Sequence, residues 1–213
     1  MSFTRWRSLV DGAEVDVGSE IPDSDLTQYS LTDPDDRITV TSETAYEARM
    51  PDGANEESRL YANRPLTDFP DTFRWEFDFE VLARSSSDGE RVYFGWDTQS
   101  DLTNTNSNNF LGLWYRGDDV DEIAVVADDG SQGTVASNLD TNTVYTIQTD
   151  IDVISEDVTV RVIEDGSQLG EASSSFSGAD NLDWHYPHQA FNIGFSSPGN
   201  LDYDLTNNRF ESI

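Results

Sequence analysis

The chain has 213 residues with 42 acidic and 12 basic side chains, and its formal net charge is −30. All twelve basic residues are Arg, and Asp outnumbers Glu by 28 to 14. Binding to a nucleic-acid backbone or to an anionic membrane surface is disfavoured, because both depend on clustered cationic side chains. The sequence contains no Cys, which excludes disulfides and thiolate metal sites, and it has no apolar run of about 18 residues that predicts membrane insertion.

The predicted elements are strands separated by turns, and helical periodicity is scarcely visible. Weaker strands are predicted at 6–10, 13–17 and 45–48. Clearer strands are predicted in chain order at 38–41, 58–63, 74–82, 91–97, 110–116, 122–127, 144–153, 158–164, 168–173, 190–195 and 209–213. Asp- and Gly-rich turns separate them. Many strands of this kind predict an all-β fold, a two-sheet antiparallel β-sandwich or jelly roll.

The domain organisation is predicted to be simple. No break in composition divides the chain, so we expect a single domain over residues 1–213, with residues 1–28 as an N-terminal arm or edge strand. The segments 144–153 and 158–164 are joined by the short sequence ISED, which predicts an antiparallel hairpin. The first residues, MSFTRWRSLVDGAEVD, lack the apolar core of a signal peptide, so we expect an unprocessed product.

The order of several segments resembles a known superfamily. These segments are FRWEFDFEVL, RVYFGWD, NNFLGLWYRG, EIAVVADDG, NLDTNTVYTIQTDIDVISEDVTVRVIEDG and NRFESI. Over roughly residues 38–213 they are similar to the concanavalin A-like lectin/glucanase superfamily, and especially to its laminin-G-like modules. The resemblance implies a jelly-roll sandwich. It does not imply one function, because the superfamily includes lectins, glycosidases, adhesion modules and virion attachment proteins.

An alternating acidic triplet, Glu76, Asp78 and Glu80, lies in the segment RWEFDFEVL. In the resemblance it corresponds to the catalytic strand of retaining laminarinase-type glycosidases, which implies Glu76 as nucleophile, Asp78 as its helper and Glu80 as acid/base. The alternative is that the triplet is the solvent-exposed face of a half-buried strand, since the opposite face is a continuous apolar stripe. Common nucleophilic machinery is also missing from the sequence. We therefore expect a protein that is not an enzyme. The stripe consists of Phe73, Trp75, Phe77, Phe79 and Val81.

Two segments are candidate ligand-binding sites. The sequence WHYPH at 184–188 offers Trp184 and Tyr186 as stacking surfaces for a sugar ring, and His185 and His188 as further ligand or metal contacts. The alternative for this segment is a loop that is anchored by aromatic packing. The Asn/Thr-rich segment 98–109 is either a solvated hairpin loop or a recognition loop. Its candidate residues are Asn104, Asn106 and Asn108.

Aspartate-rich turns are candidate Ca²⁺ sites, because Ca²⁺ prefers several oxygen ligands. The candidates are Asp33, Asp35 and Asp36, then Asp118, Asp119 and Asp121, and finally Asp202 and Asp204. The alternative is that these acids merely hold hydrated cations. No cofactor is expected to be required.

The charge balance predicts a protein built for concentrated salt, where the Debye length is about 3 Å at 1 M and self-repulsion is screened. This composition resembles that of haloarchaeal proteins and their viruses; the alternative is an ordinary acidic protein from a GC-rich genome. We expect a lectin-like virion surface or structural protein, such as a capsid decoration, turret or tail-fibre module. It would assemble in a high-salt cytoplasm as a homo-oligomer with other virion proteins, and recognise a host surface glycan or glycoprotein. A purely structural virion role and a glycoside hydrolase are the alternatives.

Overall fold

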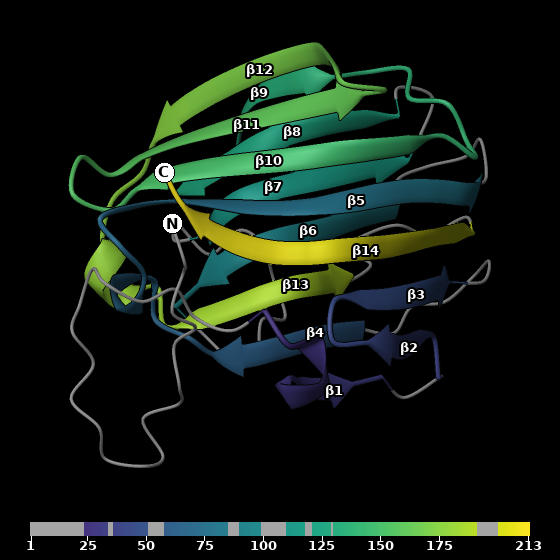
Figure 1. Ribbon diagram of the computed structural model, residues 1–213, viewed down its shortest axis with the longest axis horizontal. Helices are drawn as coiled ribbons and strands as arrows, with labels where there is room; N and C mark the ends of the chain where they lie inside the picture. The colour runs from purple at the N-terminus through teal and green to yellow at the C-terminus, as the bar shows by residue number, and fades with distance from the viewer. Residues whose placement is uncertain are drawn as a thin grey trace.

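The computed structural model describes residues 24–33, 36–50, 58–84, 90–98, 110–117, 121–128, 130–190 and 200–213, and these ranges consist mainly of β-strands (Figure 1). The strands are β1 (Ser30–Thr32), β2 (Ile38–Ser42), β3 (Ala45–Met50), β4 (Ser58–Asn63), β5 (Thr72–Arg84), β6 (Glu90–Asp97), β7 (Phe110–Gly117), β8 (Glu122–Asp128), β9 (Gly130–Ala136), β10 (Val144–Asp152), β11 (Asp157–Glu164), β12 (Ser167–Ser175), β13 (Trp184–Ala190) and β14 (Leu201–Ser212). Three short 3₁₀ turns accompany them: η2 (Leu26–Gln28), η3 (Leu66–Asp68) and η4 (Ala179–Asn181). Within the described ranges there is no helix of the length and apolar character needed to cross a membrane.

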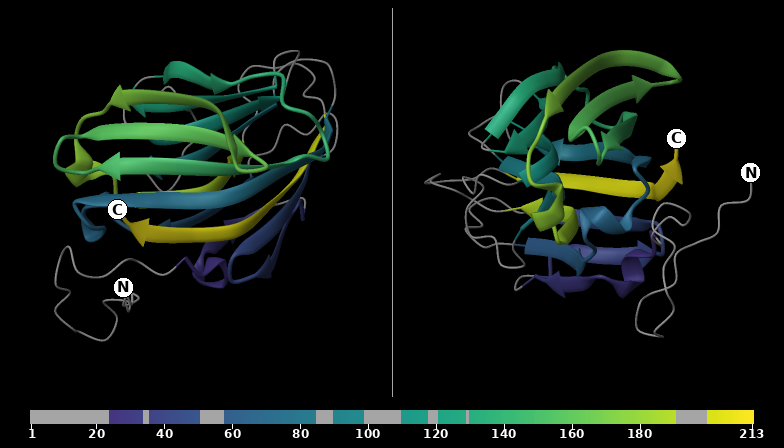
Figure 2. Two further views of the ribbon diagram at one scale, coloured as in Figure 1. Left: turned by 45° about the horizontal axis from the view of Figure 1, so that its top comes forward. Right: turned by 90° about the vertical axis from the view of Figure 1, so that its left-hand side faces the viewer.

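The strands form two seven-stranded antiparallel sheets that pack face to face (Figures 1 and 2). One sheet, the β5 sheet, has the order β12-β11-β10-β5-β14-β3-β2. The other, the β6 sheet, has the order β1-β4-β13-β6-β7-β8-β9. This arrangement confirms the predicted all-β, two-sheet sandwich.

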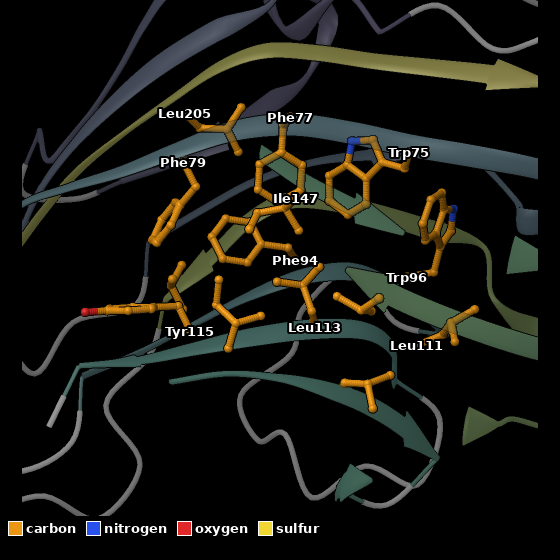
Figure 3. Close-up of a cluster of buried hydrophobic side chains, with 14 of the residues drawn as sticks. Trp75, Phe77, Phe79, Phe94, Trp96, Leu111, Leu113, Tyr115, Ile147 and Leu205 are labelled. Carbon is orange, nitrogen blue, oxygen red and sulfur yellow. The ribbon is translucent and has the colours of Figure 1, made fainter. Parts of the chain in front are cut away.

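The core between the sheets is dominated by aromatic side chains that point inward from both layers (Figure 3). Trp75 of β5 lies edge-on to Trp96 of β6, with ring centroids 5.6 Å apart. Phe77 and Phe79 both contact Phe94 of β6, at 5.3 and 5.7 Å between centroids. Rings of this size bury a large apolar area, and such contacts add about 0.5–1.5 kcal/mol per pair. The aromatic stripe of β5 therefore holds the two sheets together, as its sequence pattern predicted.

The opposite face of β5 is polar and takes part in rows of side chains that cross the β5 sheet. One row alternates in charge over five strands. Glu171 accepts a 2.6 Å hydrogen bond from Arg161, which also pairs with Asp150. Asp150 then accepts bonds of 2.6 and 2.9 Å from Arg74, and Arg74 lies 4.0 Å from Glu211. Burial raises the pKa of Asp150, but the hydrogen bonds from the two arginines more than offset this, and its pKa lies below the usual value.

The two long edges of the sandwich are closed in different ways. At one edge, β12 lies against β9 of the other sheet (Figure 1). A Cβ on Gly170 of β12 would approach the carbonyl oxygen of Val135 of β9 to 1.8 Å, so only glycine permits this contact. At the other edge, the segment around η2 inserts Leu26, which is fully buried, and hydrogen-bonds its backbone to Glu43.

Most predicted strands are present, and the differences are informative. The hairpin of β10 and β11 is confirmed, with Asp152 opposite Asp157. The segment WHYPH is not a loop but the first part of β13, which ends at Ala190 where a strand was predicted to begin. Strands β1 and β9 were not predicted. The strands predicted at 6–10 and 13–17 lie outside the described residues.

Both histidines belong to β13, and both rings point into the core and are fully buried. The hydroxyl of Tyr29 lies 2.8 Å from Nδ1 of His185. Nε2 of His188 lies 3.0 Å from the hydroxyl of Ser58, and its Nδ1 contacts the hydroxyl of Tyr203. The prediction that His185 and His188 contact a ligand or a metal at the surface therefore gains no support, because their rings pack between the sheets.

The buried histidines predict how stability depends on pH. Burial lowers the pKa of His188 to about 3, and burial together with the nearby Arg64 charge lowers the pKa of His185 well below its ordinary value. An unfolded histidine takes up a proton near pH 6.5, so below that pH the unfolded state binds more protons and the native state loses stability. We expect His188 alone to reduce the free energy of unfolding by about 2 kcal/mol between pH 8 and pH 5.

Denaturant unfolding in molar salt, repeated at intervals between pH 8 and pH 5, measures this effect. Exposed carboxylates stay ionised over that range, and salt screens their mutual repulsion. A free energy of unfolding that is constant over the whole range would contradict the neutral, buried state of the two rings.

Candidate functional site

The acidic triplet lies on the outer face of the β5 sheet, where neighbouring strands bind two of its three carboxylates. Both oxygens of Glu76 are engaged, one by Arg209 of β14 and the other by the Gln148 amide at 2.8 Å. The two oxygens of Asp78 accept bonds of 2.6 Å each, from Thr146 and Asn207. These bonds are cross-strand contacts within one sheet.

This geometry gives little support to retaining glycoside hydrolysis. That reaction requires two carboxyl groups about 5–5.5 Å apart on either side of a glycosidic bond. Glu76 and Glu80 are four residues apart on a continuous strand, a separation of about 13 Å between Cα atoms. Glu76 is also held by Arg209 and Gln148, so its described contacts are those of a structural carboxylate.

The predicted metal ligands are dispersed. Among the described residues, no group of three or more His, Asp or Glu side chains is placed to hold a metal ion. One oxygen of Asp33 accepts a 2.6 Å bond from the Ile38 amide, and Asp204 lies 2.7 Å from Arg49. Asp36 is exposed and has a positive φ, and Asp202 of β14 lies opposite Arg49 of β3 in the strand register. Ca²⁺ binding at these residues stays a prediction.

Several other candidates can be placed only in part. Asp121 is buried, pairs with Arg84 and accepts a 3.2 Å bond from Tyr115, so its contacts are structural. Asp35, Asp118, Asp119, Asn104, Asn106 and Asn108 lie outside the described residues.

The outer face of the β6 sheet has a very different character from that of the β5 sheet. Alternate residues of β4, β13, β6, β7 and β8 project outward and form a second apolar cluster, separate from the core between the sheets. We call this cluster the aromatic face. It consists of Tyr61, Tyr93, Phe110, Trp114, Val126, Trp184 and Tyr186. A sandwich sheet with one wet face would carry polar residues at these positions, so the aromatic face is the feature of the molecule that requires a functional explanation.

The aromatic face has a buried floor and a partly exposed rim. Tyr93, Phe110, Val126 and Tyr186 form the floor, with 4% or less of their surface exposed. On the rim, Trp184 lies 5.9 Å from Tyr61 between ring centroids, and Tyr61 stacks on the floor residue Tyr186 at 6.0 Å. Trp114 lies 5.7 Å from Tyr93 on the other side of the face. The floor thus fixes the orientation of the rim rings.

A pair of glycines lies below the floor rings, where the backbones of β6 and β7 are in close contact. Gly95 of β6 and Gly112 of β7 are directly opposite each other. A Cβ on Gly95 would approach the Leu111 carbonyl oxygen to 1.9 Å, and a Cβ on Gly112 would approach the Phe94 oxygen to 2.0 Å. Tyr93 and Phe110, which flank this pair, meet edge to face with centroids 5.6 Å apart. The strands that carry these two rings are thus paired at a position where the structure accommodates glycine alone.

Polar groups on the aromatic face are few. Asn63, next to Trp184 in the β4–β13 register, is exposed. Arg59 places its guanidinium 5.2 Å from the Tyr61 ring centre, a cation–π contact. Gln189 is fully buried, and neither of its amide atoms has a hydrogen-bond partner. A buried amide in this state costs about 1–3 kcal/mol. Apolar and aromatic side chains with a few polar groups among them are the usual lining of ligand sites.

Sequence reasoning found only part of this site. Trp184 and Tyr186 were predicted as ring-stacking residues, and the structure places both on the aromatic face. Tyr61, Tyr93, Phe110 and Trp114 were missed, although each lies within a predicted strand on the face opposite the core residues. The signal for this face was present in RVYFGWD and NNFLGLWYRG. In both segments aromatic residues occupy odd and even positions, so they point to both faces of the strand.

The comparisons with known proteins establish the fold. No family model and no curated protein matches the sequence. The legume lectin-like domain from Entamoeba histolytica is similar in structure, with 14% identity, a TM-score of 0.56, and coverage of 88% of this chain and 92% of that domain.

Two further solved structures share the fold. Peanut lectin is 13% identical, with a TM-score of 0.54 and coverage of 87% and 93%. An alginate lyase is 14% identical, with a TM-score of 0.55 and coverage of 89% and 88%. The chain therefore has a concanavalin A-like, lectin-like β-sandwich fold. Because lectins and a lyase share that fold, it does not decide between binding and catalysis.

The glycine pair gives a direct test of the aromatic face. We expect Gly95→Ala to reduce the free energy of unfolding by about 3 kcal/mol or more, because the methyl group meets backbone atoms that cannot move independently. Gly133→Ala on β9 is the matched control, since its Cβ would lie 3.7 Å from the Ala172 methyl, an ordinary contact. Denaturant unfolding of both variants measures the difference. Equal stability of the two variants would show that the strands do not approach as described.

The acidic triplet is tested by Glu76→Gln. This variant keeps one oxygen for Arg209, and the Gln148 amide can turn so that its oxygen accepts from the new NH₂ group. We therefore expect a loss of stability below about 1 kcal/mol and no change in any glycan-binding or glycan-cleaving property. Reducing-end release from β-glucans and alginate, assayed in molar salt, checks this for wild type and variant together. Hydrolysis by the wild type that disappears in Glu76→Gln would restore the catalytic interpretation of the triplet.

Proposed function

We propose that the protein is a glycan-binding, non-enzymatic module and that its ligand stacks on the rim of the aromatic face, at Tyr61 and Trp184. The observation that carries this proposal is the contrast between the two outer faces. The outer face of the β5 sheet carries ion pairs that involve Arg74, Asp150, Arg161, Glu171, Glu76 and Arg209, whereas the outer face of the β6 sheet carries aromatic rings. An aromatic surface of this kind marks an interaction site.

The rim suits a sugar ring in its chemistry and in its rigidity. The carbon–hydrogen face of a pyranose is apolar, and it packs on an aromatic plane while the hydroxyls at its edge remain free for hydrogen bonds. Tyr61 stacks on Tyr186, and the Arg59 guanidinium lies over its ring, so the ring is fixed in orientation and little of its freedom is lost when a sugar takes the place of Arg59. Asn63 lies next to Trp184 and supplies an amide for those hydroxyls.

The net charge of the protein suggests the salt concentration at which it works. A net charge of −30 opposes the compact state in dilute buffer and is screened in concentrated salt, so we propose that the module works at high salt. A place on a virion surface, self-assembly and a host glycoprotein as partner stay predictions, since no described contact bears on them.

Replacing the rim tryptophan tests the proposal. We expect Trp184→Ala to weaken glycan binding about tenfold, because it removes a half-buried stacking ring. Binding is measured in molar salt by a glycan array and then by calorimetry with the polysaccharides that bind. Ile154→Ala is the control, because Ile154 is 74% exposed on the β10–β11 turn, away from the aromatic face.

Two results would contradict the proposal. One is a wild-type protein that binds no glycan on the array at any salt concentration. The other is binding that Trp184→Ala leaves unchanged while the variant retains the thermal stability of the wild type.

A further inference from the structure

Gln189 carries a buried amide on the aromatic face, and both polar atoms of this amide lack a hydrogen-bond partner. Gln189 follows the bulge in β13 and lies between two neighbours in register, Arg59 of β4 and Tyr93 of β6. Its side chain is fully buried, and both Oε1 and Nε2 lack a hydrogen-bond partner. Every other buried polar group of β13 has a partner on at least one atom, as with Nδ1 of His185 and both ring nitrogens of His188.

An unsatisfied amide specifies the chemistry of what would satisfy it. The oxygen needs a donor and the NH₂ group needs an acceptor, and the two atoms are side by side. A carboxylate or sulfate ligand offers acceptors alone and leaves Oε1 unpaired. An ammonium ligand offers donors alone and leaves Nε2 unpaired. Neighbouring hydroxyls on a sugar ring offer one donor and one acceptor at the required spacing, and they carry no charge.

The charged residues near the amide also favour an uncharged ligand. Arg116, on the same face of β7, is opposite Glu122 at 3.7 Å. Arg59 lies over the Tyr61 ring. Asp97 on β6 is fully buried and accepts a 3.3 Å bond from Thr98. The described face thus combines cationic and anionic groups and has no cluster of arginines of the kind that selects an anionic polymer.

We infer that the aromatic face selects uncharged glycans and that Gln189 is its specificity-determining residue, through paired hydrogen bonds to neighbouring hydroxyls. This inference rests on the proposed glycan-binding function and narrows it to one substrate class. Arg59 is the partly exposed neighbour of Gln189 in the β4–β13 register, and its guanidinium lies over the Tyr61 ring. Because Gln189 is fully buried, the inference requires that side chains around the amide move aside when a ligand binds. The stacking residues then supply affinity for sugar rings in general, and Gln189 selects rings that present neighbouring free hydroxyls. Uronates also carry such hydroxyls, and they are disfavoured because the described face has no arginine cluster to pair with their carboxylates.

The experiment compares wild type, Gln189→Met and Gln168→Met in molar salt. Methionine has nearly the shape of glutamine but makes no strong hydrogen bonds, and Gln168 is an exposed glutamine on β12 that serves as the matched control. The probes are laminarin and mannan as neutral polysaccharides, and alginate and polygalacturonate as uronates. Calorimetry gives the affinities, and thermal unfolding without a probe gives the stabilities.

We expect the wild type to bind at least one neutral polysaccharide more tightly than either uronate. We expect Gln189→Met to lose about tenfold in affinity for that polysaccharide, while its unfolding temperature without a probe is equal to or above that of the wild type. Gln168→Met should match the wild type in both respects. Lower affinity together with undiminished stability separates a ligand-binding amide from a structural one.

The contradicting results are distinct. If the wild type binds glycans but Gln189→Met binds them equally well, or melts well below the wild type, the role of Gln189 is wrong and the proposed function stands. If the wild type prefers the uronates, the neutral class is wrong and glycan binding again stands. If the wild type binds none of the four probes and no glycan on the array, the proposed function fails, and this inference fails with it.

Discussion

The packing of the β5 aromatic stripe against β6 and β7 is the interaction on which the rest of the structure depends. Phe73, Trp75, Phe77 and Phe79 are at most 1% exposed, and their partners lie on the facing strands (Figure 3). Because side chains alternate along a strand, this packing forces Glu76, Asp78 and Glu80 to the outside. The acidic triplet is therefore a consequence of the core arrangement, and the hydrogen bonds around it complete the sheet surface.

The same alternation, applied to the opposite sheet, separates structural from functional surfaces. Both faces of β6 and β7 are apolar, one contributing to the core and the other to the aromatic face. Such strands normally occur where both faces of a sheet are covered. In a chain with 42 acidic residues, a surface of aromatic rings runs against the overall composition. It contains the unsatisfied amide of Gln189, on which the proposed specificity of the site rests.

Local pattern was enough to predict the sandwich, the β10–β11 hairpin and the inward stripe of β5, since each rests on alternation and turn chemistry over a few residues. Strand β13 was misread because Pro187 suggests a loop. In the structure the register shifts between His185 and His188, so the proline lies at a bulge where a ladder bond is already absent. That shift also turns both histidines inward and Gln189 outward. The aromatic face itself depends on the order β4-β13-β6-β7, which joins residues from distant parts of the chain.

Footprinting with hydroxyl radicals, with and without a bound neutral glycan, tests the division between the two outer faces most directly, because it reports on both in one measurement. The account predicts protection of Tyr61 and Trp184 on the β6 sheet and unchanged reactivity of side chains around Glu80 on the β5 sheet. Protection centred on the acidic triplet, with Trp184 as reactive as in the free protein, would contradict it.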